Sequence, residues 1–224
     1  MASQTQTSPE MLVEMLLHLG RLAQAEDSPA TVSTGGSTGG STGGSTGGST
    51  ALSTAQWTAL RYLGNANRSS RTPSAFAKFH GTTRGTASQT IRGLVKQGFL
   101  TQSRAAGDGR GRQLDLTEKA KAMRPCDPFE AVARAAGDLP PAVRRQFGAA
   151  MAQILHSVAQ EKGARPFGTC TSCVHLECGG SEPGTDNFYA CGMTHNLLDN
   201  EALEQLCVNF QRTASSTLPG TAGR

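Results

Sequence analysis

Apolar residues return every three to four positions near the start of the chain, the spacing that places them on one face of an α-helix. Ser8 can cap this helix, Pro9 suits its first turn and Glu10 complements the helix dipole. The apolar face consists of Leu12, Met15, Leu16, Leu19 and Leu22. We expect the helix to end before Pro29 and to bury this face on its own domain or on a second copy of the chain.

The same spacing predicts three helices between residues 53 and 98. The first covers about 53–65 and the second about 73–79, and a tight turn at 80–82 precedes the third. Thr83 caps the third helix and Gly98 closes it in the left-handed conformation that glycine favours. The buried positions are Trp57, Leu60, Tyr62 and Leu63, then Phe76 and Phe79, and finally Ala87, Ile91, Leu94 and Val95.

Two short stretches of alternating polarity, 99–101 and 113–116, follow the third helix and predict a pair of strands. A glycine-rich basic turn joins them, and its Asp108-Gly109 pair is typical of a β-hairpin. Short helices, a tight turn, a longer helix with a polar face and a basic hairpin together indicate a winged helix-turn-helix. The predicted fold class is mainly α (α+β).

Helical spacing returns after the hairpin. A helix begins at 117–119 and is interrupted by Pro125, a second covers about 128–136, and a third starts at 139–141. The third helix carries Phe147, Met151, Ile154 and Leu155 at near-helical spacing. Near the end of the chain we expect a further helix over about 200–210, with Leu203, Cys207 and Phe210 on its inner face.

Charge is distributed unevenly along the chain. Residues 51–124 hold thirteen Lys and Arg against three Asp and Glu, a net charge of +10, and the other residues sum to −6. A strongly basic module beside acidic flanks favours a polyanionic partner, because phosphate binding is driven by the release of counterions. A solubilising basic surface would have the same composition.

The residues from 52 to 123, about a third of the chain, resemble the MarR family of bacterial transcriptional regulators. LSTAQWTALRYL is similar to the helix that the family places before its helix-turn-helix. TTRGTASQTIRGLVKQGFL is similar to its recognition helix and the strand after it, and AAGDGRGRQLDLTEKA to its wing. Gly85 and Gly93 depart from a good helix-forming sequence, each at a cost of up to ~1 kcal/mol of helix propensity.

This resemblance assigns the residues that would meet DNA. The recognition helix would present Arg84, Thr86, Ser88 and Gln89 to base edges in the major groove, where Arg pairs with guanine and Gln with adenine. Arg92 and Lys96 would contact phosphates, which position the protein without reading sequence. Arg110 at the wing tip would reach the minor groove, and Arg104 and Arg112 would flank it on the wing. Any one of these taken alone could be a solvated surface charge.

The resemblance also implies the partners. MarR-family proteins form a homodimer through their first and last helices, and the two recognition helices read a palindromic operator in double-stranded DNA. Their effector pockets lie between the dimer helices and the winged domain, so a small-molecule effector is a further candidate partner. Repression is the expected mode of regulation. A monomer that buries the same helices internally is the alternative.

Five cysteines gather beyond Pro166, where glycines and turns dominate. A segment this poor in large apolar residues needs an additional cross-link to hold its fold. Thiolates that bind one metal would supply that cross-link. The best ligand set is Cys170, Cys173, Cys191 and Cys207, with Cys178 as the substitute and His175 or His195 less favoured. Zinc and an iron–sulfur cluster both suit four thiolates, as a purely structural staple or as a redox or metal sensor. Cys126 is expected to be a buried apolar residue.

The remaining sequence features limit the classes of function that the protein can have. No nucleotide-binding glycine motif, hydrolytic triad or carboxylate pair appears, so we expect no enzyme; the alternative is a redox protein that uses the CxxC motif or a cluster, with the basic module as a nucleic-acid tether. No apolar run is long enough to cross a membrane and the start lacks a secretory signal, so a bacterial cytoplasmic protein is expected.

These patterns divide the chain into six parts. They are an N-terminal helix region over 1–32, a disordered STGG repeat over 33–50, the winged helix over 51–124, dimerisation helices over 125–165, a cysteine-rich metal-binding segment over 166–212 and a disordered end over 213–224.

Overall fold

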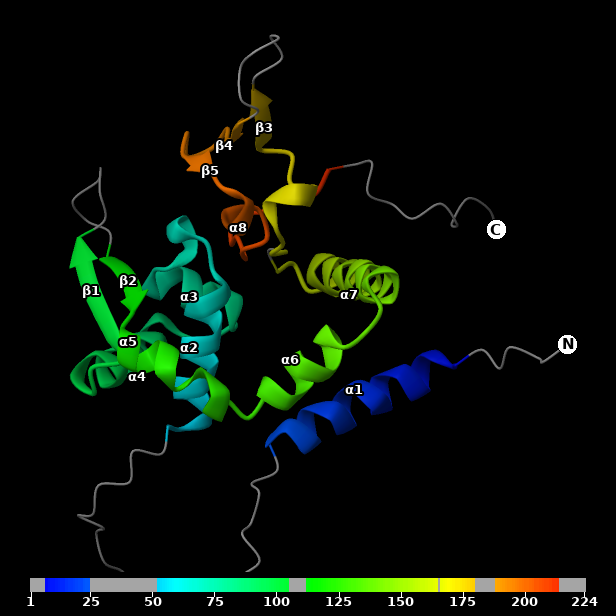
Figure 1. Cartoon of the computed structure of the whole chain (residues 1–224), viewed down its shortest axis with the longest axis horizontal. Helices are drawn as coiled ribbons and strands as arrows, with labels where there is room; N and C mark the ends of the chain where they lie inside the picture. Colours follow the sequence, from blue (N-terminus) through cyan, green and yellow to red (C-terminus); the bar gives the residue numbers. More distant parts are fainter. Residues whose placement is uncertain (1–6, 25–51, 105–111, 165, 180–187, 214–224) are drawn as a thin grey trace, which may run out of the picture. The chain divides into compact units, whose positions relative to one another are not determined.

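The computed structural model describes residues 7–24, 52–104, 112–164, 166–179 and 188–213 (Figure 1). The STGG repeat, the wing tip with Arg110 and residues 214–224 lie outside this part of the chain. The described elements fall into two compact units, each treated by itself below. No helix of the described part is long and apolar enough to cross a membrane.

The first unit contains α1 (Pro9–Gln24), the 3-10 turn η2 (Arg124–Cys126), α6 (Glu130–Gly137) and the first residues of α7 (Pro141–Glu161). The backbone N–H of Met11 donates to the hydroxyl of Ser8 at 3.2 Å, so the predicted cap is present. Within α1 only Ala23 is buried, and the whole apolar face predicted from the sequence is exposed in the single chain.

Cys126 corrects one expectation. We predicted a buried apolar residue, but its side chain is exposed on η2. The sequence carries no signal for this difference, because burial here depends on whether another element covers a short turn, and none of the described residues of its unit does so.

The second unit is built on the winged helix. Its elements are α2 (Thr54–Asn65), the 3-10 turn η1 (Arg68–Ser70), α3 (Pro73–Phe79), α4 (Arg84–Lys96), β1 (Leu100–Arg104), β2 (Arg112–Leu116) and α5 (Glu118–Ala122). Each α-helix begins after a Ser or Thr whose hydroxyl accepts a hydrogen bond from a backbone N–H of its first turn. The predicted cap of α4 by Thr83 is therefore confirmed.

The core of the winged helix comes from the apolar faces of these helices and of the wing strands. The buried side chains include Leu60, Leu63, Phe76, Ile91, Leu94, Phe99, Leu100 and Leu114. Burial of each contributes roughly 1.5–3 kcal/mol, which anchors α4 by its apolar face and leaves its polar face outward. Trp57 and Val95 are half-buried at the edge of this core.

The end of α4 shows why glycine is required there. Gly98 has φ +74°, and it lets the N–H of Gly98 bond to the carbonyl of Val95 at 3.0 Å and the N–H of Phe99 to that of Leu94 at 2.9 Å. This pair of backbone hydrogen bonds ends the helix and directs the chain into β1. Gly81, with φ +59°, makes the turn between α3 and α4.

The wing is an antiparallel hairpin in which Leu100 pairs with Leu116 and Arg104 with Arg112. Its second strand is also bonded to the chain between α2 and α3, since the N–H of Leu114 donates to the carbonyl of Arg71 at 2.8 Å. Residues 65–71, called the connecting segment below, therefore hold the wing against the helices.

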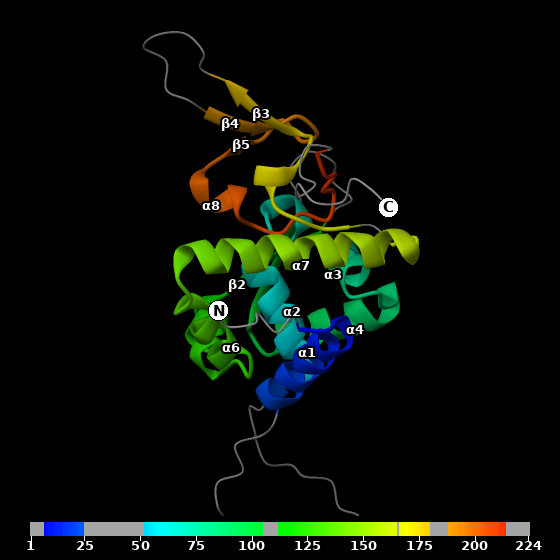
Figure 2. The same ribbon diagram turned by 90° about the vertical axis from the view of Figure 1, so that its right-hand side faces the viewer.

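The described residues from 166 to 213, called the tail below, form the rest of the second unit together with most of α7 (Figures 1 and 2). The tail contains η3 (Cys170–Ser172), β3 (Leu176–Gly179), β4 (Phe188–Cys191), β5 (Leu197–Leu198) and α8 (Asn200–Leu203). The three strands form one antiparallel sheet in the order β3-β4-β5.

The predicted helix over 200–210 is wrong in its extent, because α8 ends at Leu203. Beyond it the backbone makes long-range bonds instead of helical ones. The N–H of Leu206 donates to the carbonyl of Asn65 at 2.7 Å, and the N–H of Cys207 donates to that of Gly168 at 2.8 Å. Leu203, Cys207 and Phe210 are nevertheless all buried, as expected for the inner side of this stretch.

Candidate nucleic-acid interface and cysteine cluster

The outer face of α4 is polar and accessible. Arg84, Thr86, Gln89, Arg92 and Lys96 are all exposed, whereas Ser88 is half-buried. The opposite face, with Ala87, Ile91 and Leu94, is buried against the core. The helix can therefore offer one continuous polar surface to a partner without losing its own packing.

Two of these side chains are already engaged on the helix itself. The hydroxyl of Thr86 shares a hydrogen bond of 2.9 Å with that of Thr83, the capping residue. Nε of Arg92 donates to the carbonyl of Ser88 at 3.3 Å, which holds the guanidinium along the helix. Thr86 is thus part of the cap, a local role that the spacing of polar residues did not reveal.

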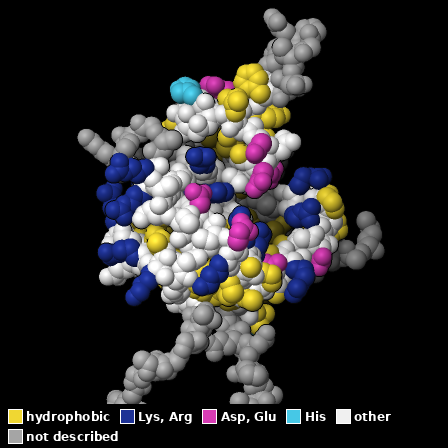
Figure 3. Space-filling model, turned by 60° about the vertical axis from the view of Figure 1, so that its left-hand side comes forward, with side chains coloured by type: hydrophobic (Ala, Val, Ile, Leu, Met, Phe, Trp, Pro, Cys, Tyr) yellow, Lys and Arg dark blue, Asp and Glu magenta, His cyan; other side chains and the backbone are white. Residues whose placement is uncertain are grey.

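The wing brings two more cations to the surface. Arg104 and Arg112 face each other at the open end of the hairpin, and both are exposed. Arg112 donates to Oε1 of Gln102 at 3.3 Å. Arg110 lies outside the described residues. Figure 3 shows several Lys and Arg side chains following one another along one edge of this surface.

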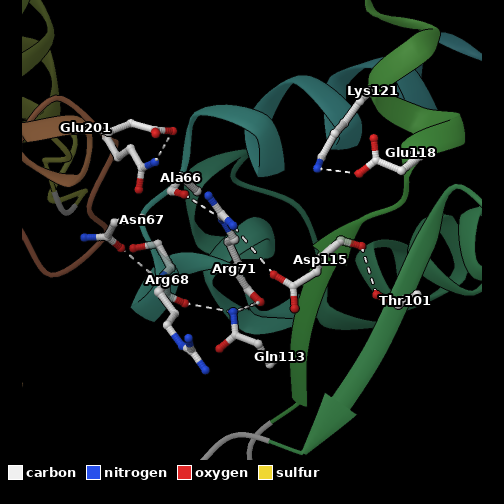
Figure 4. Close-up of polar contacts among 12 residues, drawn as sticks. Ala66, Asn67, Arg68, Arg71, Thr101, Gln113, Asp115, Glu118, Lys121 and Glu201 are labelled. Carbon is white, nitrogen blue, oxygen red and sulfur yellow. Dashed lines mark hydrogen bonds and ion pairs between the residues drawn. The ribbon is translucent and has the colours of Figure 1, made fainter. Parts of the chain in front are cut away.

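Other cations of the basic module have structural roles. Arg71 donates through Nε to the carbonyl of Ala66 at 2.8 Å and pairs with Asp115 at 3.6 Å, so it ties the connecting segment to the wing (Figure 4). Lys119 donates to the carbonyl of Gln97 at 2.8 Å and lies 4.3 Å from the ring centre of Phe99. Neither role could be read from the sequence, because both depend on contacts across the fold.

Residues 52–111 match the model of the MarR family. Among solved structures, the chain is similar to Streptococcus pneumoniae FabT in complex with DNA, with 20% identity over 49% of this chain and 77% of that one at a TM-score of 0.38. It is also similar to Staphylococcus aureus MepR bound to ethidium bromide, with 17% identity over 68% and 97% of the two chains at a TM-score of 0.36.

A MarR transcriptional regulator from Methanosarcina mazei Go1 is similar at 19% identity, over 47% of this chain and 77% of that one, with a TM-score of 0.37. The comparison with curated proteins gives no match. The family match over residues 52–111 confirms the resemblance to the MarR family, and the described residues 52–104 and 112–122 form a winged helix-turn-helix.

The tail places four of its cysteines around one pocket. Cys170 and Cys207 are buried, Cys173 and Cys191 are half-buried, and all four line the same hollow. They come from separate elements: the start of η3 and the residue after it, the end of β4 and the chain after α8. The substitute, Cys178, is exposed on β3 opposite Tyr189 and does not line this pocket.

Burial and neighbouring groups shift the pKa values of two of these thiols. Burial raises the pKa of Cys170 to about 11, and the thiolates of Cys207, Cys173 and Cys191 add to the rise. Burial also opposes ionisation of Cys191, but hydrogen bonds from Thr194 and the backbone of Met193 outweigh it and lower its pKa. Backbone amides directed at a cysteine sulfur stabilise a thiolate, the form that binds metal.

The two histidines considered as ligands differ. His175 lines the same pocket, and its buried Nε2 has no hydrogen-bond partner among the described residues. His195 is exposed, has φ +55° and donates its backbone N–H to the carbonyl of Cys191 at 2.7 Å, which makes the turn after β4. Among the described residues, no group of three or more Cys, His, Asp or Glu side chains has an arrangement that could hold a metal ion.

Proposed function

We propose that this protein is a DNA-binding transcriptional regulator whose recognition helix is α4. The observation that carries the proposal is the exposed polar face of α4, which a buried apolar face anchors next to a basic hairpin. A helix of this kind fits the major groove, and a hairpin beside it reaches the flanking backbone or minor groove. The match to the MarR family supports a regulatory role rather than an enzymatic one.

The side chains divide by their place on α4. Arg84 and Gln89 are exposed near the N-terminal end of the recognition helix and would read base edges, with Ser88 and the Thr86 cap bordering them. Arg92 and Lys96 lie one and two turns further along and would contact phosphates. The wing cations Arg104, Arg110 and Arg112 would anchor the other side of the site.

The regulator would act as a homodimer. α1 exposes eight large hydrophobic side chains and α7 exposes five, among them Leu16 at 40% and Phe147 at 50%. Apolar faces of this size are buried by a partner in soluble proteins. A second copy is the occupant that fits, because the MarR family dimerises through its first and last helices. Two α4 helices would then read a palindromic operator, and binding over a promoter would repress it.

A small-molecule effector would bind beside α7. A pocket in the second unit is lined by Gln153, His156 and Gln160 of α7 and by Phe210 and Arg212 of the tail. Nδ1 of His156 is buried, and no described residue provides it with a hydrogen-bond partner. A hollow that combines apolar side chains such as Phe210 with a buried polar atom available for a hydrogen bond is typical of a small-molecule site.

The decisive experiment selects bound fragments from a random DNA library and measures their affinity by fluorescence anisotropy at several salt concentrations. We expect a palindromic preference and a steep loss of affinity with salt, since each phosphate contact releases counterions. Arg92→Ala should weaken binding to all sequences and reduce the salt dependence, whereas Gln89→Ala should change the preferred base.

The control is Arg134→Ala, which removes the same charge from α6, outside the winged helix, and should leave affinity unchanged. Failure of the dimer to bind any duplex at low salt would refute the proposal. Equal effects of Arg92→Ala and Arg134→Ala would refute the assignment of α4 as the recognition helix.

A further inference from the structure

We propose that Cys170, Cys173, Cys191 and Cys207 bind one thiolate-ligated metal centre, and that this centre holds the tail against the connecting segment so that its occupancy sets DNA affinity. The DNA part rests on the proposed function; the metal part does not. The shared chemistry is that of a soft metal with sulfur ligands, either Zn²⁺ or an iron–sulfur cluster.

The donor set fits such a metal. Four thiols line one pocket, and two of them stand three residues apart in a turn where the N–H of Cys173 donates to the carbonyl of Cys170 at 3.0 Å. The other two arrive from the end of β4 and from the chain after α8. No three or more His, Cys, Asp or Glu side chains of the described residues are spaced as metal ligands, so binding requires the four thiols to move together, as in small domains whose metal sites form when the metal binds.

The composition of the tail explains why a staple is needed. The residues buried in the described tail are Cys170, Leu203, Cys207 and Phe210, so two of the four are cysteines. Its sheet leaves large apolar side chains exposed, such as Phe188 at 50% and Leu197 at 75%. A segment of this size with so few buried apolar groups gains too little from burial to hold three strands in place. Four metal–sulfur bonds would supply the missing stability.

The coupling to the winged helix runs through the neighbours of one proposed ligand. Leu206 exchanges backbone hydrogen bonds with the connecting segment: its N–H donates to the carbonyl of Asn65 at 2.7 Å, and its carbonyl accepts from Asn67 at 2.9 Å. On the other side of Cys207, the N–H of Val208 donates to the hydroxyl of Ser70 at 3.1 Å. A metal bound at Cys207 therefore fixes the backbone that joins the tail to the helices.

The connecting segment passes this constraint to the wing. Its Arg71 is bonded to β2 through the N–H of Leu114 and through the ion pair with Asp115, and Gln113 donates to the carbonyl of Arg68 at 2.9 Å (Figure 4). One stretch of seven residues, 65–71, thus contacts the tail and the wing strand, and it leads directly into α3. Loss of the metal would weaken the contact between the tail and the connecting segment, and the DNA-binding surface would become less rigid.

The first arm of the test measures metal in the whole protein, purified without oxygen. We expect one centre per chain, seen as bound zinc by elemental analysis or as iron and sulfide with visible absorbance. Cys173→Ser should lose the centre, while the matched variants Cys178→Ser and Cys126→Ser should retain it. A wild-type protein without metal, or equal loss in Cys178→Ser, would overturn the site.

The second arm measures DNA affinity with and without the metal. Removal by a chelator, or Cys173→Ser, should weaken binding to the selected operator by at least about fivefold, the lower end of ordinary coupling between two sites. Ser70→Ala should keep the metal and lose this response, whereas Ser69→Ala next to it should keep both. Metal binding without any change in affinity would overturn the coupling.

The two parts of the test separate the metal site from its coupling to DNA binding, because one measures metal content and the other measures DNA affinity. If neither metal-loaded nor metal-free protein binds DNA, the proposed function fails, and the metal content of the wild type and the three cysteine variants still decides the site.

Discussion

Val208 donates its backbone N–H to the buried hydroxyl of Ser70 at a distance of 3.1 Å. This hydrogen bond joins residues that are 138 positions apart in the sequence. Ser70 lies in the 3-10 turn that leads into the helix-turn-helix, and Val208 follows a buried cysteine of the tail. The cysteine-rich tail is therefore part of the same packed unit as the winged helix, and the two are joined by main-chain bonds as well as by the contact between Phe79 and Phe167, whose ring centres are 4.3 Å apart.

This bond predicts the effect of Ser70→Ala on stability. The substitution leaves the N–H of Val208 without its acceptor in a partly buried site, which should cost about 1–3 kcal/mol. Chemical denaturation followed by circular dichroism measures the difference. The control is Ser69→Ala, which removes a hydroxyl that donates to the side chain of Asn67 and should cost less. Equal values would show that the tail contact does not contribute.

Two glycines around α4 should respond with opposite signs. Gly98 has φ +74°, and alanine there forces a left-handed backbone that costs roughly 1–2 kcal/mol. Gly85 lies inside α4, and a Cβ there would meet the hydroxyl of Thr83 at an ordinary 3.7 Å. Gly85→Ala should therefore stabilise the fold by about 0.5–1 kcal/mol. Thermal unfolding of the two variants tests both signs, and the same sign in both would contradict the assignment of the α4 boundary.

The exposed apolar faces predict a change of oligomeric state. Leu16→Glu in α1 and Phe147→Glu in α7 each place a charge in the proposed dimer interface and should shift the protein to monomer in sedimentation velocity. Leu197→Glu is the matched control, because Leu197 is 75% exposed in the tail, outside both helices. A wild-type monomer, or a dimer that survives both charged substitutions, would exclude these faces as the interface.

His80 gives the fold a pH dependence of known sign. Burial lowers its pKa, and the nearby charge of Arg61 lowers it further, while the rings of Phe76 and Phe79 lie 4.8 Å away. The folded protein therefore prefers neutral His80. Its stabilising effect is complete above the unfolded pKa of about 6.5 and is lost as the pH falls through that value toward the folded pKa.

We expect an NMR titration of His80 to give a pKa below the ordinary histidine value of about 6.5. His80→Phe, which retains an aromatic ring in the cluster, should reduce the loss of stability on acidification. The contrary result, a pKa for His80 above the ordinary histidine value of about 6.5, would place a compensating negative charge beside the ring.

Local signals along the chain were sufficient for the winged helix. Ser53, Thr72, Thr83 and Thr117 each begin a helix because a hydroxyl that satisfies a free backbone N–H acts within three residues. The alternation around the Asp108-Gly109 turn likewise determines which strand residues face inward, as with Leu100 and Leu114. Such signals act over a few residues, so they can be read without knowing what lies across the fold.

Failures occurred where distant contacts compete with local preference. The stretch 200–210 has helical spacing, yet the backbone of Leu206 and Cys207 bonds to Asn65 and Gly168 and the helix ends at Leu203. Cys126 has an apolar side chain that no described element of its unit covers. In both cases the outcome depends on a partner that the neighbouring sequence does not specify.

The sequence by itself determined the helix-turn-helix, its basic face and the CxxC turn, because capping, periodicity and spacing are properties of consecutive residues. Only the tertiary structure decided that Cys191 and Cys207 join that turn around one pocket while Cys178 stays outside it. It alone also decided that the tail is bonded to the connecting segment at Asn65 and Ser70. Hydrogen bonds between residues more than a hundred positions apart form only when the whole chain has packed, and no local pattern records them.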